Sequence, residues 1–165
     1  MIDFAVIGSG ISGATISNKL SKKYSIKVFE KAKGVGGRSS FKRFKGKIGF
    51  DHGLQYLSPR SRKFKSFTSK LIKKRVIKLW KGNHEFLNER VKRDKKHVKL
   101  IGLRGNNDIS KHLLKTINCK FQSELSKIQR QKNCWFLKFK DNTNTYAKNL
   151  IITAPFPQVK KLASK

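Results

Sequence analysis

The sequence predicts an α/β fold, whose parallel sheet begins with a β-α-β unit. Two short apolar runs flank a segment with helical spacing, at Ile2–Ile7 and Ser25–Glu30. The first run leads into a glycine-rich turn at Gly8–Gly13. A third apolar run, Leu150–Thr153, lies near the other end of the chain. Near-continuous apolar runs of this length are typical of strands that are covered on both faces, as in parallel sheets.

The composition fits a folded protein with an unusual charge. The chain has 165 residues, 37% of them hydrophobic, which is enough for one domain or for one domain and part of another. Forty Lys and Arg against nine Asp and Glu give a formal net charge of +31. Such a charge favours nucleic acid or an anionic membrane surface as a partner. The lysines recur in nearly every segment, however, although Lys70–Lys99 is denser than the rest, and no nucleic-acid-binding motif accompanies them. We therefore interpret the charge as a compositional bias on exposed faces and expect no specific nucleic-acid partner.

The cysteines and histidines do not form a metal-binding pattern. Cys119 and Cys134 lie in no C-x-x-C pair, and the four histidines are scattered, so we expect free thiols and no metal. The first strand begins at about Ile2, which leaves no room for a signal peptide. No apolar run approaches the ~20 residues of a membrane-spanning helix. These observations predict a cytoplasmic protein without a membrane span.

The glycine-rich turn has the G-x-G-x-x-G spacing of a dinucleotide-binding site. Gly8 permits a tight turn off the strand, Gly10 lets the backbone approach a pyrophosphate, and Gly13 lets the following helix pack closely. The helix is expected from Ile11 to about Lys22, and its first residues, Ile11 and Ser12, offer unpaired N–H groups to phosphates. We therefore predict that this turn binds the diphosphate of a dinucleotide.

An acidic residue ends the second strand. Glu30 follows Gly8 at roughly the 20-residue spacing expected of an acid that accepts hydrogen bonds from ribose hydroxyls. Its carboxylate would repel a 2′-phosphate, which argues against NADP. The alternative is an ordinary α/β domain with a glycine-rich turn, in which Glu30 and the later Gly36-Gly37-Arg38 would be coincidences.

A second glycine pair distinguishes FAD from NAD. The segment from Glu30 to Arg38 resembles the E-x(5)-G-G-R signature of the flavin amine oxidoreductase superfamily, and within it the renalase-like proteins. The resemblance implies that Lys31, Gly36, Gly37 and Arg38 lie beside the FAD diphosphate, where a guanidinium can donate two parallel hydrogen bonds. FAD is therefore the expected cofactor, and NAD is disfavoured. A flexible basic loop is the alternative interpretation.

The next segment, Phe41–Leu57, is expected to be extended and broken at glycines. Phe41–Phe44 is expected to pair with Lys47–Phe50 through a turn at Lys45-Gly46. The residues from Phe50 to Leu57 resemble the family segment F-D-x-G-A-Q-Y-F, which passes near the flavin ring, with Leu54 in place of the small alanine. This resemblance makes Asp51, Gly53 and Gln55 candidate cofactor contacts. An aspartate in a turn and a glutamine on a strand are an equally weighted alternative.

Residues 58–119 resemble the start of the family's substrate domain. A helix is expected over Arg60–Lys74, starting near Ser58-Pro59. Short strands are expected over Val76–Trp80, His84–Asn88 and Val98–Leu103, with Trp80 and Phe86 in the core. A second helix is expected after Gly105, with Asn107 or Asp108 as its N-cap and with Ile109, Leu113 and Ile117 on one face.

The last part of the chain predicts a β-meander and a final parallel strand. The meander is expected over Phe121–Tyr146, and the resemblance implies that the backbone at Leu125 contacts the adenine. Leu150–Pro155 is expected to be a buried parallel strand. Together with Phe156-Pro157-Gln158, it resembles the family's V-V-L-A-x-P-x-P-Q-A, which places Ala154 in the cofactor site.

The resemblance also implies a domain organisation. Residues 1–57 and 120–165 are expected to form a discontinuous Rossmann-like FAD/NAD(P)-binding domain, into which a partial α+β substrate segment, 58–119, is inserted. Family members continue with a further substrate-domain sheet and a last glycine-rich FAD segment, which this sequence lacks. The sequence therefore resembles the N-terminal half of a renalase-like flavoprotein, and a complementary C-terminal chain is a candidate partner.

Three functions follow from these observations. The resemblance implies an FAD-dependent oxidoreductase, whose flavin accepts a hydride equivalent from an amine or a reduced nicotinamide-like donor and passes electrons to oxygen or another acceptor. No side chain is identified as a catalytic acid or base. The second hypothesis is an inactive or weak dinucleotide-binding module. The third is a basic nucleic-acid-binding protein on a Rossmann scaffold, which fold alone does not exclude.

Overall fold

The structure, a computed structural model, describes residues 1–44, 48–81 and 98–163. Its large sheet contains six strands: β1 Ile2–Ile7, β2 Ile26–Phe29, β7 Asn118–Lys120, β8 Leu125–Arg130, β9 Trp135–Phe139 and β10 Asn144–Ile152. Two small sheets pair β3 Phe41–Arg43 with β4 Gly49–Asp51, and β5 Ile77–Leu79 with β6 Leu100–Gly102. The α-helices are α1 Ile11–Leu20, α2 Arg62–Lys73, α3 Asp108–Leu113 and α4 Phe156–Ala163.

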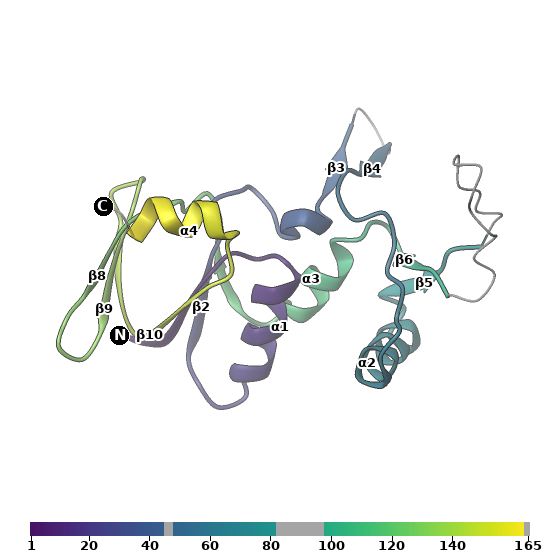
Figure 1. The fold of residues 1–165 in the computed structure, drawn as a ribbon, viewed down its shortest axis with the longest axis horizontal. Helices are drawn as coiled ribbons and strands as arrows, with labels where there is room; N and C mark the ends of the chain where they lie inside the picture. Colours follow the sequence, from purple (N-terminus) through teal and green to yellow (C-terminus); the bar gives the residue numbers. More distant parts are fainter. Residues whose placement is uncertain (45–47, 82–97, 164–165) are drawn as a thin grey trace.

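The large sheet combines a parallel part with an antiparallel meander. Its strand order is β7-β2-β1-β10-β9-β8. The first four strands are parallel to one another, whereas β9 pairs antiparallel with both β10 and β8. The small β5–β6 sheet and α2 lie at the opposite end of the elongated molecule (Figure 1). This arrangement confirms the predicted α/β class, with β1, α1 and β2 as the first β-α-β unit.

The central strand β1 is covered on both faces. Val6 packs with Ala14 of α1 and Val28 of β2 in one core cluster. Ala5 and Ile7 belong to a second cluster, together with apolar residues of β2 and the meander: Phe29, Leu125, Leu137, Phe139 and Ala147. Successive side chains of a strand point to opposite faces. The near-continuous apolar run is therefore explained by two cores, one on the α1 side and one on the meander side.

The last strand joins two elements that the sequence predicts separately. The first half of β10 pairs antiparallel with β9, and its second half pairs parallel with β1, as in Ile152 opposite Ile7. The predicted parallel pairing of Leu150–Ile152 is confirmed, but these residues are half-buried, so the prediction that the strand is buried is wrong. Ile151 packs against the core cluster on the α1 side, whereas Leu150 and Ile152 pack against the cluster on the meander side. The three residues therefore lie at the edges of the two cores and are only partly covered.

Several boundaries in residues 58–119 differ from the predictions. Helix α2 starts after Ser61, whose hydroxyl accepts a hydrogen bond from Phe64 N (3.2 Å), instead of near Pro59. The expected strand His84–Asn88 and the core residue Phe86 lie outside the described residues. Trp80 is 38% exposed and contacts the Tyr56 ring, so its expected place in the core is wrong. The reason is that the end of β5 lies at the surface, where the preceding Leu79 is also exposed.

Helix α3 and strand β7 lie with the large sheet. α3 packs against α1, and Asn18 Nδ2 donates to Leu113 O (2.8 Å). β7 pairs parallel with β2. α3 ends at Leu113, so Ile117 lies beyond the helix, although it still packs against the core. Residues 108–120 thus contact α1 and β2, although the predicted second part of the Rossmann-like domain starts only at residue 120. The domain limits remain a prediction.

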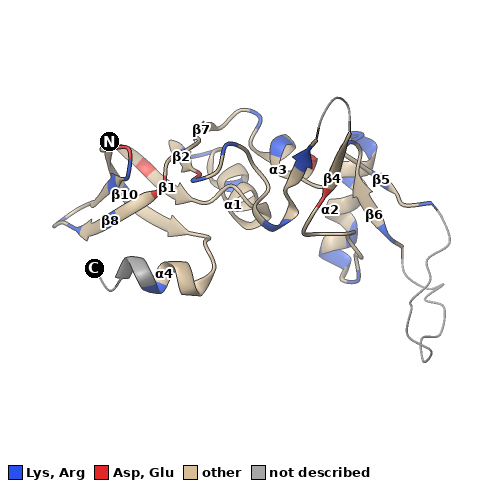
Figure 2. Ribbon diagram, turned by 90° about the horizontal axis from the view of Figure 1, so that it is seen from above, with Lys and Arg blue, Asp and Glu red and all other residues tan. Residues whose placement is uncertain are grey.

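Positive charge is present on all parts of the described chain but is densest near α2 (Figure 2). Residues 58–81 contain ten Lys and Arg and no Asp or Glu. The ion pairs among described residues involve Asp3, Asp108, Glu124 and Asp141, and none of those ten cations. Within the part that the structure describes, no helix is both long and apolar enough to cross a membrane.

Candidate dinucleotide-binding site

A cavity of about 1220 Å³ lies at the carboxyl ends of β1, β2 and β10. Parallel α/β sheets bind ligands at this edge, because the loops that follow the strands meet there. The cavity is lined by Lys140 and by residues of five segments: Ile7 to Ser12, Phe29 to Ser40, Gly53-Leu54, Ser123 to Ser126, and Thr153 to Gln158. Twelve of the fifteen sequence-predicted site residues are among them: Gly8, Gly10, Ile11, Ser12, Glu30, Lys31, Gly36, Gly37, Arg38, Gly53, Leu125 and Ala154.

Two glycines of the first turn are required by the fold itself. Gly8 has φ +103°, which side-chain-bearing residues rarely adopt, and its N–H donates to Phe29 O (2.8 Å). A Cβ on Gly13 would overlap the carbonyl oxygen of Gly8. Gly13 therefore brings α1 against the turn, and it does not line the cavity. This packing is the role that the sequence predicts for it.

Gly10 is different, because the protein leaves room for a side chain there. It has φ −66°, and a Cβ would lie 3.7 Å from the nearest protein atom, Gly36 O. That distance is an ordinary van der Waals contact. Gly10 lines the cavity and is the N-cap residue of α1, which no side chain caps. The free space at Gly10 thus lies beside an uncapped helix N-terminus, whose N–H groups attract anions.

The second glycine pair lies against the first turn. Gly36 N donates to Ser9 O (3.2 Å), and Gly36 forms a parallel β-bridge with Gly10. Gly36 has φ +128°, and a Cβ there would lie 2.9 Å from both the Asn107 Cβ and the Ser40 Cα. The exposed Arg38 follows on the cavity wall. Both glycine-rich segments thus present their backbones to the same part of the cavity.

Glu30 joins the two segments through its carboxylate. It is 8% exposed, and its Oε2 accepts hydrogen bonds from Ser9 N (2.8 Å) and Ser9 Oγ (2.7 Å). Its Oε1 accepts one from Ala32 N (2.9 Å). A carboxylate has about four lone-pair sites, so one acceptor position remains on Oε1. Glu30 therefore fixes the turn and still has one acceptor position; its contact with a ribose remains a prediction.

The start of β8 forms the far end of the cavity. Ser123 N donates to Glu30 O (2.9 Å), which places this segment beside the end of β2. Glu124 pairs with Lys140 (2.8 Å), and this hydrogen bond is the main reason that the pKa of Glu124 lies below its usual value. Leu125 is buried and packs in the second core cluster. Sequence reasoning missed Ser123, Glu124 and Lys140, because their place in the cavity wall depends on the pairing of the meander strands.

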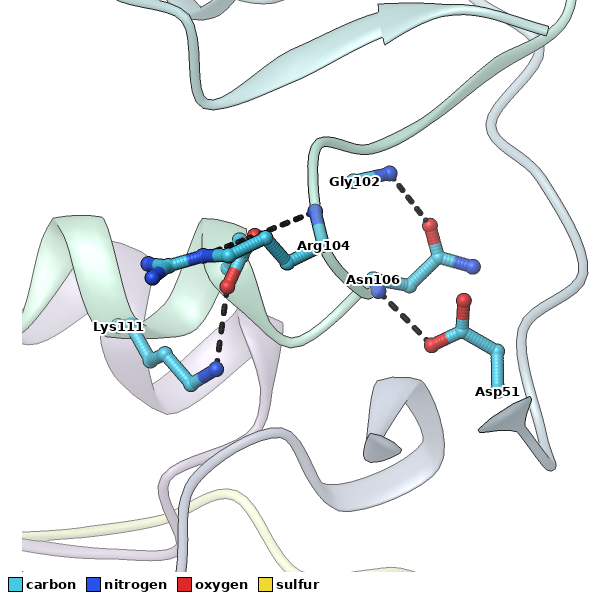
Figure 3. Close-up of polar contacts among 6 residues, drawn as sticks. Asp51, Gly102, Arg104, Asn106 and Lys111 are labelled. Carbon is cyan, nitrogen blue, oxygen red and sulfur yellow. Dashed lines mark hydrogen bonds and ion pairs between the residues drawn. The ribbon is translucent and has the colours of Figure 1, made fainter. Parts of the chain in front are cut away.

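Asp51 and Gln55, which were expected near the flavin, do not line the cavity. Asp51 Oδ1 accepts a hydrogen bond from Asn106 N (2.8 Å), as Figure 3 shows. The Asn106 side chain, fully buried, accepts from Gly102 N (2.8 Å) and donates to Leu54 O (2.7 Å) and Gln55 O (3.3 Å). The 51–55 segment is thus held by residues that follow β6. Its cavity contacts come from Gly53 and Leu54 instead.

The same loop is braced at the start of α3. Asp108 Oδ2 accepts from Arg104 N (2.9 Å), and Asp108 Oδ1 pairs with Lys111 (3.0 Å; Figure 3). Asn107 occupies the N-cap position but makes no capping bond with its side chain. Across the residues that the structure describes, no three His, Cys, Asp or Glu side chains are placed to hold a metal ion.

Comparison with known proteins identifies the fold. A family model of the NAD(P)-binding Rossmann-like domain matches residues 6–71. A triple mutant from a redesign of cofactor binding in putrescine oxidase matches with a TM-score of 0.75 and 11% identity, over 98% of this chain and 59% of that one. Wild-type putrescine oxidase bound to putrescine matches with a TM-score of 0.71 and 12% identity, over 98% and 60%. This chain therefore spans about three fifths of the length of those proteins.

These matches agree with the β-α-β unit that begins the large sheet. At such low identity they show a shared fold, and the match covers nearly the whole chain. The chain has the fold of an NAD(P)-binding Rossmann-like domain, in the arrangement that putrescine oxidase also adopts.

Proposed function

We propose that this chain binds FAD through its ADP half, as part of a flavin-dependent oxidoreductase. The observation that carries the proposal is Gly10, where the fold leaves room for a side chain beside an uncapped helix N-terminus. Gly36 and Gly37 lie against the same place. Two glycine-rich backbones that converge on one cavity suit a diphosphate, which accepts hydrogen bonds from N–H groups.

Each part of the ADP half has a candidate binding group. The N–H groups at Ile11 and Ser12 would hold the diphosphate, and Arg38 would donate two hydrogen bonds to it. The remaining acceptor position of Glu30 would take a ribose hydroxyl. The backbone at Leu125 would contact the adenine, as the family resemblance implies. Lys31, Gly53 and Ala154 complete the cavity wall.

The proposed reaction is the oxidation of a small donor by the flavin. A bound flavin accepts a hydride equivalent and is reoxidised by an electron acceptor. An amine or a reduced nicotinamide-like compound is the donor that the resemblance implies, and oxygen is one acceptor. We also propose that a complementary C-terminal chain supplies the flavin-ring contacts of the family's last FAD segment. The residues of this chain bind and orient the ADP half.

The direct test compares ADP with FAD on the purified chain. Isothermal titration is expected to show ADP binding almost as tightly as FAD, because most of the candidate contacts on this chain are proposed for the ADP half. The protein is expected to be colourless or to contain less than stoichiometric flavin. If neither nucleotide binds at millimolar concentration, the proposal is wrong. A yellow protein that contains one flavin per chain and forms peroxide when a donor is added would show that this chain binds the whole cofactor, and not only its ADP half.

Replacing Glu30 with glutamine is expected to weaken ADP binding by about 1–3 kcal/mol, since a charge-assisted hydrogen bond to the ribose is lost. An amide must also direct an N–H group towards Ser9 N or Ala32 N, so the melting temperature should fall as well. ADP and 2′-phospho-ADP would be titrated into both proteins.

The control for this change is Asp141→Asn, at an exposed turn outside the cavity lining. It is expected to bind ADP as the unmodified chain does. Wild-type protein should also prefer ADP over 2′-phospho-ADP, because the Glu30 carboxylate repels the added phosphate. Tighter binding of 2′-phospho-ADP would contradict the role of Glu30.

A further inference from the structure

One polar group in the cavity wall has no partner in the described protein. Ser123 is 1% exposed and lines the cavity, and its hydroxyl makes no hydrogen bond among the described residues. A buried hydroxyl without a partner costs free energy. Such groups are rare in folded proteins and call for an explanation at each site. Ser17 and Ser110 are also buried without a partner, but neither lines the cavity.

The position of Ser123 is fixed by the backbone around it. Ser123 N donates to Glu30 O (2.9 Å), and Gln122 N donates to Ala32 O (3.1 Å). On the other side, Lys140 N donates to Glu124 O (2.9 Å). Gln122 itself has φ +52°, which is uncommon for a residue with a side chain. This turn is therefore held in an unfavourable conformation that brings Ser123 against the end of β2, and such strain is often found at binding sites.

We infer that the Ser123 hydroxyl binds the nucleoside part of the dinucleotide. The inference rests on the proposed function and adds a group to it. The N–H of Ser123 donates to the backbone of Glu30, the candidate ribose acid. Leu125, the candidate adenine contact, follows two residues later. A hydroxyl both donates and accepts, so it can pair with a ribose hydroxyl or with a base nitrogen. A bound nucleoside would then satisfy the group that the protein leaves unpaired.

The test compares Ser123→Ala with Ser17→Ala. Both changes remove a buried hydroxyl without a partner, so neither is expected to lower the melting temperature. Ser17 lies on α1 and does not line the cavity, which makes Ser17→Ala the matched control. ADP would be titrated into both variants and into the unmodified chain. Ser123→Ala is expected to bind ADP about five- to tenfold more weakly, the usual effect of one lost hydrogen bond, and Ser17→Ala to bind it unchanged.

Two further probes locate the contact. Inorganic pyrophosphate has no nucleoside, so the Ser123→Ala change is expected to leave its affinity the same. If Ser123→Ala does not weaken the binding of 2′-deoxy-ADP, the Ser123 hydroxyl pairs with the ribose 2′-hydroxyl. If it weakens that binding as well, the hydroxyl pairs with the base or with the ribose 3′-hydroxyl. Both results support the inference. Equal ADP affinity of Ser123→Ala and the unmodified chain would overturn it while the proposed function stands. If the unmodified chain binds no ADP, both fall together.

Discussion

Replacing Gly10 with valine is expected to weaken ADP binding at least about a hundredfold, which corresponds to about 2.8 kcal/mol, while the chain stays folded. The added side chain would enter the part of the cavity where the diphosphate is proposed to lie. The protein itself tolerates a Cβ there, since the nearest atom would be 3.7 Å away and φ is −66°. Calorimetric titration with ADP, together with thermal unfolding, would measure the two effects separately.

Gly13→Ala is the contrasting variant. Its Cβ would overlap the Gly8 carbonyl oxygen, so the melting temperature should fall well below that of Gly10→Val. A graded series, Gly10→Ala and then Gly10→Val, should lose affinity with increasing side-chain size. ADP affinity in Gly10→Val that matches the unmodified chain would show that the diphosphate does not lie at this turn.

Replacing Asn106 with alanine is expected to lower the free energy of unfolding by about 2–4 kcal/mol, because it removes several buried hydrogen bonds at once. Asn106 is fully buried, and its side chain bonds to the backbone of Gly102, Leu54 and Gln55. Truncation leaves these backbone groups without that partner. Urea unfolding of both proteins would give the difference, provided that the slope with urea concentration is unchanged.

The neighbouring Asn107 provides the matched control. It is 8% exposed, and the side-chain oxygen of Asn107 makes no hydrogen bond in the described structure. Asn107→Ala is therefore expected to change the unfolding free energy by less than about 1 kcal/mol. Asn106→Ala should also weaken ADP binding slightly, since Asn106 holds the segment of Gly53 and Leu54 that lines the cavity. Equal losses of stability in the two variants would contradict the special role of Asn106.

The dinucleotide-binding turn could be predicted from the sequence because its requirements are local. Gly8 needs a positive φ, Gly13 needs close helix packing, and the strands on either side need apolar residues at both faces. All of these requirements fall within about thirty consecutive residues, as the motif itself does. The hairpin of β3 and β4 was predicted for the same reason, since its paired strands are close in the sequence.

Partners that are distant in the sequence could not be predicted in this way. Asp51 was expected at the flavin, but its carboxylate bonds to Asn106, which lies 55 residues later. Neither residue type nor periodicity specifies which distant backbone N–H group a carboxylate will meet. Trp80 was expected in the core, but it lies at the exposed end of β5, and the local sequence does not specify which end of a short strand is covered.

The sequence by itself determined the β-α-β unit, the two glycine-rich segments and the acid at the end of the second strand. These features depend on backbone conformation and apolar periodicity, which neighbouring residues set. The tertiary structure alone decided that β10 joins the meander to the parallel sheet. It also decided that the Glu30 carboxylate accepts three hydrogen bonds from the protein, and that Ser123 lines the cavity. Each of these outcomes is a contact between segments far apart in the chain, and such contacts exist only once the strands have paired and the two cores have packed.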